Sequence, residues 1–157
     1  MNIYDDEVKQ EMAESLLPLL LDNVDAVMFC MELLYVYHLW DDLVDMDRER
    51  SAEDVNKAFS IVLMEFRRNP FYAANRYDLD PLITLSILQW HDSNVLEAHG
   101  EESGLRKAFM LRAYIYQIWA YCAYLVGGLD HYREVGPLIQ SMYQEEYDEY
   151  KKEFAHA

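Results

Sequence analysis

The sequence predicts an all-α protein, a single domain over residues 1–157 built as a bundle of five to six helices. Apolar residues recur at helical spacings of three and four along most of the chain, and few stretches alternate with period two. Five glycines and four prolines in 157 residues leave long uninterrupted segments. Because apolar residues make up 52% of the chain, a domain of this length can bury a core without cross-links. Long helices with short connections favour a bundle.

The first two helices are predicted at the N-terminal end of the chain. An amphipathic helix is expected at 4–17, ending near Pro18. A second helix is expected at 22–46, with Asp22 or Asn23 as its N-cap. Either side chain can accept a hydrogen bond from the unpaired amides of a first turn.

The third and fourth helices are predicted from their start and stop signals. Ser51-Ala52-Glu53-Asp54 resembles a capping box and predicts a helix that ends before Asn69-Pro70. Asp80-Pro81 combines a capping residue with a proline suited to the first helical position. A fourth helix is therefore expected from this pair to about Gly100.

Two further helical regions are expected in the last third of the chain. A long apolar helix is predicted at 105–126, stopped by Gly127-Gly128. The last region, at 130–154, is expected to be interrupted or started at Gly136-Pro137.

Charge is distributed unevenly along the chain. With 29 acidic and 13 basic side chains, the net charge is −16 at pH 7. Residues 1–60 hold 15 acidic and 4 basic side chains, a balance of −11. Since binding to a phosphate backbone needs a basic face, nucleic acid is excluded as a partner.

Compartment signals favour a cytoplasmic protein without membrane association. The acidic N-terminus lacks the basic start and apolar core of a signal peptide. The uncharged stretch Ala113–Leu129 has 17 residues, whereas a membrane-spanning helix needs about 20. Cys30 and Cys122 both lie inside apolar runs, which does not suggest a disulfide framework.

The strongest chemical pattern lies near the end of the second predicted helix. His38, Asp41, Asp42 and Asp45 fall within roughly 100° of the helix circumference, so their side chains converge. We call Asp41, Asp42 and Asp45 the acidic stripe. The rest of the helix is apolar nearly all round, which predicts burial.

Buried carboxylates need compensation, because an uncompensated one costs several kcal/mol. A cation, arginine partners, protonation or a water-filled cleft can each supply it. Mg²⁺ is the candidate cofactor, because a hard divalent ion prefers oxygen ligands. Alternatively, Asp42 and Asp45 lie at a solvated helix end near Arg48 and Arg50.

The acidic stripe also resembles a known motif. Asp41-Asp42-Leu43-Val44-Asp45 is similar to the first Asp-Asp-x-x-Asp motif of class I isoprenoid synthases of the squalene and phytoene synthase type. Tyr121–Gly128 resembles the apolar, glycine-ended helix of that family. The resemblance implies that Asp41, Asp42 and Asp45 bind Mg²⁺ ions that hold a substrate diphosphate.

The whole chain is also similar to short hypothetical proteins of bacteriophages and prophages. The segments His38–Asp45 and Arg68–Tyr72 recur there in similar form. That resemblance implies no particular activity.

The first functional hypothesis is a small metalloprotein that acts on a phosphorylated or diphosphate-containing molecule. Mg²⁺ on the acidic stripe would neutralise the leaving group. His38 is a candidate ligand or general base. The guanidinium of Arg112 is always charged, and we expect it either to bind a phosphate or to form a structural salt bridge to the acidic stripe.

The second hypothesis is a non-enzymatic acidic interaction or inhibitor protein, encoded by a phage, that binds a basic host protein. Its charge would speed association by electrostatic steering. A third is a helical homo-oligomer whose tyrosine-rich faces meet. The sequence alone does not decide whether the protein is an enzyme.

Overall fold

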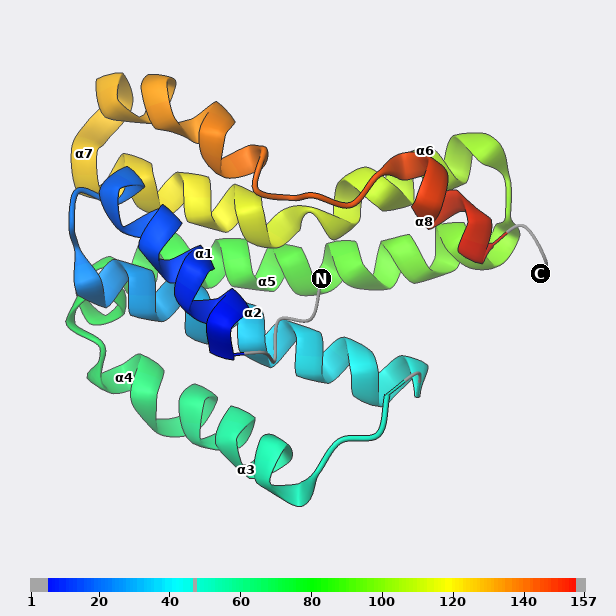
Figure 1. The fold of residues 1–157 in the computed structure, drawn as a ribbon, viewed down its shortest axis with the longest axis horizontal. Coiled ribbons are helices and arrows are strands. Elements are labelled where there is room, and N and C mark those ends of the chain that lie inside the picture. Colours follow the sequence, from blue (N-terminus) through cyan, green and yellow to red (C-terminus); the bar gives the residue numbers. More distant parts are fainter. Residues whose placement is uncertain (1–5, 47, 155–157) are drawn as a thin grey trace. The chain divides into compact units, whose positions relative to one another are not determined.

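The computed structural model describes residues 6–46 and 48–154. Every regular element in these ranges is helical, which confirms the all-α class (Figure 1). Contacts divide the chain into two compact units. The first contains the residues up to 76 together with 125–127, and the second contains 77–124 together with the residues from 128 on. The single domain expected over 1–157 stays a prediction.

The first unit begins with two helices close to those expected. α1 spans Asp6–Leu19 and α2 spans Val24–Asp45; residues 4 and 5 of the first predicted helix lie outside the described residues. Asn23, rather than Asp22, is the N-cap of α2, and its Oδ1 accepts a hydrogen bond from the Ala26 amide at 3.0 Å. α1 packs against α2.

The capping box of the third helix is confirmed. The Ser51 Oγ accepts a hydrogen bond from the Asp54 amide at 3.1 Å, and the Asp54 carboxylate accepts one from the Ser51 amide at 3.0 Å. The helical run from this cap comprises α3 (Ala52–Ser60), the π-helix η1 (Ile61–Glu65) and α4 (Phe66–Arg68). It ends before Asn69, as expected.

The predicted start of the fourth helix is wrong. α5 spans Pro70–His99, and Pro81 lies inside it. The Asn69 Oδ1 accepts a hydrogen bond from the Tyr72 amide at 2.9 Å, so Asn69-Pro70 both ends one helix and caps the next. Two residues with the same chemistry, Asp80 and Pro81, were mistaken for the start.

The long apolar helix expected at 105–126 is interrupted. α6 spans Glu102–Arg112 and α7 spans Tyr114–Gln140, with a break at Ala113, whose ψ is 9°. The predicted break at Gly127-Gly128 is confirmed, because Gly128 has φ 76° and ψ −173°, outside the helical region. The helix resumes after this kink.

The last helical region breaks later than expected. Gly136-Pro137 lies inside α7, and the non-helical segment follows at 141–146. α8 then spans Tyr147–Glu153. Pro137 removes one backbone donor from the helix but does not end it, and Ser141 still donates a backbone hydrogen bond to the Pro137 carbonyl at 3.1 Å.

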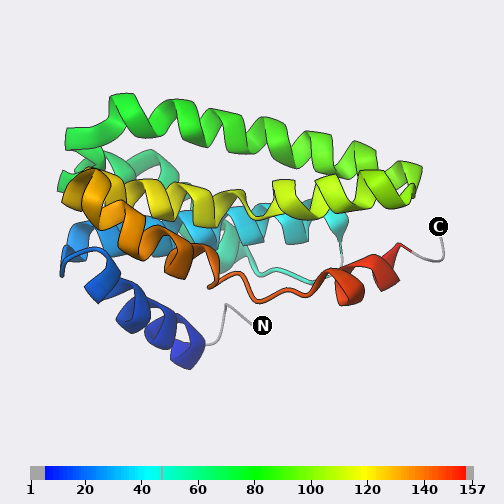
Figure 2. The ribbon, with the colours of Figure 1, turned by 90° about the horizontal axis from the view of Figure 1, so that it is seen from above.

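Within the second unit, α6 and the first half of α7 run alongside α5 (Figure 2). α8 packs on α6, where Tyr150 meets Leu105 and Ala108 in a buried cluster. Of the helices in the described ranges, none is both long and apolar enough to span a membrane.

Candidate functional site

The acidic stripe lies on the last two turns of α2, and its three carboxylates have different surroundings. Asp42 is buried, Asp41 is half-buried and Asp45 is exposed. Leu43 and Val44 are 46% and 45% exposed. The predicted burial is confirmed for much of α2, whose buried residues extend to Asp42, and is wrong for its last turn, which lies at the surface.

An arginine compensates the buried carboxylate. The Arg50 Nε donates a hydrogen bond to the Asp42 Oδ2 at 2.8 Å, and the Arg50 Nη2 forms an ion pair with the same oxygen. The side chains are only 10% (Arg50) and 11% (Asp42) exposed. A left-handed residue, Met46 (φ 55°), ends the helix before the chain returns to Asp42. Arginine partners were one of the compensations that the sequence required.

His38 is half-buried one turn before the acidic stripe. Burial lowers the pKa of His38 below its usual 6.5, although the carboxylates of Asp41 and Asp42 act in the opposite direction. His38 is therefore neutral at pH 7. A neutral imidazole is the form that serves as a metal ligand or a general base.

The Mg²⁺ site stays a prediction. Among the described residues, no three His, Cys, Asp or Glu side chains are grouped so that they could hold a metal ion. The Arg50 guanidinium contacts the Asp42 Oδ2, so an ion bound to that oxygen would compete with this contact. The carboxylates of Asp41 and Asp45 keep the oxygen chemistry that Mg²⁺ prefers.

Arg112, the other candidate catalytic residue, belongs to the second unit and has partners there. Its Nη2 donates to the Glu97 Oε2 at 2.7 Å and to the Asn94 Oδ1 at 3.1 Å, and its Nε contacts the Glu97 Oε1. Glu97 is 5% exposed and also accepts a hydrogen bond from the Tyr150 hydroxyl. The structure thus gives Arg112 a buried carboxylate on α5 as its partner.

Sequence reasoning did not single out the outer face of α1. Glu7, Glu11 and Glu14 are exposed and follow one another at steps of four and three. Met12 and Leu16 on the same helix are buried. We call these three glutamates the α1 acidic face; the spacing was readable in the sequence, although the stronger pattern at 35–45 obscured it.

A second surface feature of the first unit is apolar. Four large side chains around the start of η1 are between 44% and 63% exposed: Phe59, Val62, Leu63 and Met64. They lie where α3 passes into the π-helix. Short π-helical segments inside α-helices occur frequently at functional sites.

Comparisons with protein family models, curated proteins and solved structures found no match to this chain. The resemblances to isoprenoid synthases and to phage proteins therefore stay predictions.

Proposed function

We propose that this chain is a non-enzymatic binding protein whose acidic surface recognises a basic partner protein. The observation that carries the proposal is the α1 acidic face, which exposes Glu7, Glu11 and Glu14 along one side of a helix. It lies in the most acidic part of the chain, where residues 1–60 have a balance of −11.

Physical chemistry supports a cationic partner for this face. Like charges at steps of three and four on a helix repel by about 0.2–0.5 kcal/mol per pair, and a bound cationic surface relieves that repulsion. The field of a chain with a net charge of −16 also steers basic proteins toward it and raises their association rate.

The exposed apolar side chains of the first unit could form the apolar core of an interface. Aromatic and methionine side chains are enriched in interface cores, and Phe59 and Met64 are exposed in the same unit as the α1 acidic face. A partner that combines apolar anchors with a basic rim would complement both features.

Two of the candidate site residues have structural partners, which also favours binding over catalysis. Asp42 forms an ion pair with Arg50, and Arg112 forms one with Glu97. Truncating one partner of a buried pair is costly, so these groups contribute to folding whether or not they contribute to function.

The experiment compares two charge variants of equal net charge. E7Q/E11Q/E14Q removes the α1 acidic face, and E101Q/E134Q/E146Q removes three exposed glutamates from the second unit. Each variant and the wild type are immobilised and incubated with host lysate at low and high salt. We expect the wild type and the second variant to retain the same basic protein at low salt, and the first variant to lose it.

Two results would overturn the proposal. Equal loss in both variants would mean that net charge alone attracts proteins and that the α1 acidic face is not a binding surface. Failure of the wild type to retain any basic protein at low salt would remove the binding function itself.

The second candidate function is the Mg²⁺-dependent reaction on a phosphorylated or diphosphate-containing molecule. Asp41 and Asp45 support it, because they lie four residues apart near the end of α2 and neither is fully buried. Its test is Mg²⁺-dependent hydrolysis of 4-nitrophenyl phosphate and of inorganic diphosphate by the wild type and by D41N/D45N. Turnover lost in the variant would favour this candidate, and no turnover by the wild type would exclude it for these substrates.

A further inference from the structure

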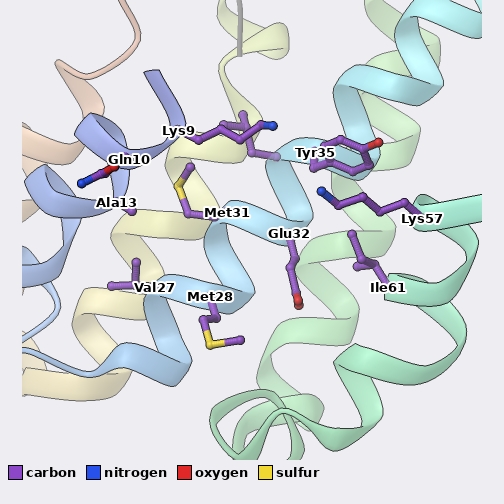
Figure 3. Close-up of a pocket in the computed structure, with 11 residues that line it drawn as sticks. Lys9, Gln10, Ala13, Val27, Met28, Met31, Glu32, Tyr35, Lys57 and Ile61 are labelled. Carbon is purple, nitrogen blue, oxygen red and sulfur yellow. The ribbon is translucent and has the colours of Figure 1, made fainter. Parts of the chain in front are cut away.

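The first unit contains a groove that the functional arguments above do not use. It has a volume of about 340 Å³ and lies between α1, α2, α3 and η1 (Figure 3). Apolar side chains make up most of its wall: Ala13, Val27, Met28, Met31, Leu34 and Ile61. This volume is at the lower end of the range of small-molecule sites, roughly 300–1,000 Å³.

Two lysines from different helices meet at this groove. The Nζ atoms of Lys9 and Lys57 lie 5.9 and 4.7 Å from the centroid of the Tyr35 ring, and Figure 3 shows both side chains extending toward it. The Tyr35 hydroxyl donates a hydrogen bond to the Asp54 Oδ1 at 3.2 Å, which fixes the ring. Two positive charges thus lie near one aromatic ring of a largely apolar groove.

Two carboxylates lie near these lysines. Asp54 accepts hydrogen bonds from the backbone and hydroxyl of Ser51. Glu32 also lines the groove and interacts electrostatically with Lys57, although Figure 3 shows its carboxylate pointing away from the Lys57 ammonium group. An anion bound at this ring between the two ammonium groups would be stabilised by both.

We propose that the groove binds a free single-chain fatty carboxylate, with the alkyl chain on Val27, Met31 and Ile61 and the carboxylate between Lys9 and Lys57. An apolar wall with a few convergent polar groups is the usual form of a small-molecule site. Met28 and Met31 are flexible enough to adapt to an alkyl chain. The inference is independent of the proposed protein-binding function.

The size and charge of the site select this ligand class. A volume of about 340 Å³, near the lower end of small-molecule sites, fits one medium-length alkyl chain better than a two-chain lipid. Among the described lining residues there is no arginine, the side chain best suited to bidentate phosphate binding. A net charge of −16 further disfavours a multiply charged head group.

The test measures binding of decanoate by isothermal titration calorimetry, with 1-decanol and decyltrimethylammonium as ligands of matched chain and different charge. The variant K9M/K57M removes both ammonium groups and keeps unbranched side chains. The control K107M/R133M removes two exposed positive charges from the second unit. We expect K9M/K57M to bind decanoate at least about tenfold more weakly, as the loss of hydrogen bonds to a charged group predicts, and the control to bind like the wild type.

Further measurements distinguish a free fatty carboxylate from ligands with the same alkyl chain and from a lipid membrane. The wild type should bind decanoate more tightly than decanol, and decyltrimethylammonium more weakly than either. Equal decanoate affinity in wild type and K9M/K57M, or absence of decanoate binding, would overturn the proposal. Binding to phosphatidylglycerol vesicles without binding to free decanoate would also overturn it, because the groove would then recognise a membrane surface.

Discussion

The hydroxyl of Tyr150 on α8 donates a hydrogen bond to the buried carboxylate of Glu97 on α5, across 53 residues of sequence. Arg112, the last residue of α6, binds the same carboxylate. Burial, and then the Glu97 carboxylate, raise the pKa of Tyr150, so its hydroxyl stays protonated and remains a donor at physiological pH. One carboxylate therefore connects three helices of the second unit.

Replacing Tyr150 by phenylalanine should weaken this connection without disturbing the packing. The ring contact with Phe109, at 5.3 Å between centroids, is retained, whereas a hydrogen bond to a charged group is lost. We expect the free energy of unfolding to fall by about 1.5–3 kcal/mol in urea denaturation. Amide hydrogens of α8 should also exchange faster.

Tyr147 provides the matched control for that substitution. Its hydroxyl donates to the exposed Glu102 carboxylate at 3.1 Å. The loss in Tyr147→Phe should be smaller than that in Tyr150→Phe, because water replaces a bond at the surface. Equal losses in the two variants would show that the buried position of Glu97 adds nothing.

The pair formed by Arg112 and Glu97 should show strong coupling. Arg112→Met leaves a carboxylate that is 5% exposed without its cation, and we expect a loss of about 3–5 kcal/mol. Glu97→Gln in that background removes the uncompensated charge, so the double variant should recover part of the loss. A double-mutant cycle by urea denaturation measures the coupling, and strictly additive losses would contradict it.

The elements that could be predicted from the sequence are those with local signals. The Asn23 cap, the Ser51–Asp54 capping box and the break at Gly128 each depend on residues within one turn, and all three are confirmed. The start of α5 was mistaken because Asn69-Pro70 and Asp80-Pro81 carry the same local signal. Only the observed hydrogen bond from Tyr72 to Asn69 identifies which of the two pairs caps the helix.

The contacts that define the candidate site depend on tertiary structure instead. The sequence required a positive partner for the acidic stripe, but the choice of Arg50 depends on how the chain turns after Met46. Likewise, the burial of Glu97 beside Arg112 follows from the packing of α5 and α6. The groove at Tyr35 combines residues from separate helices, which no sequence spacing relates.

The histidine at position 38 should make the stability depend on pH. Because its folded-state pKa is lowered from 6.5, the unfolded state binds more protons between the two pKa values. The stabilisation from neutral His38 is therefore present above about pH 6.5 and is lost as the pH falls through the folded-state pKa.

Replacing His38 by glutamine should remove this part of the pH dependence. Urea denaturation at about pH 7.5 and about pH 5.5 should show a smaller loss of stability on acidification in His38→Gln than in the wild type. His99→Gln, at an exposed position, is the control and should follow the wild type. An identical loss in all three proteins would contradict the argument.

The Asp42–Arg50 pair provides a test of whether a divalent ion can serve the acidic stripe. Arg50→Met leaves the Asp42 carboxylate largely buried without its cation. We expect a loss of about 2 kcal/mol, less than for a fully buried pair because the end of α2 is near water. If Mg²⁺ can take the place of the guanidinium, it should raise the melting temperature of this variant, through binding to the folded state.

Thermal melts in MgCl₂ and in NaCl of equal ionic strength separate specific binding from screening. Arg50→Met should gain more from MgCl₂ than from NaCl, and adding Asp41→Asn and Asp45→Asn should abolish the difference. Arg48→Met, at an exposed position, should respond equally to the two salts. An equal response of Arg50→Met to both salts would show that its carboxylates are screened but do not coordinate the ion, and the metal hypothesis would lose its remaining support.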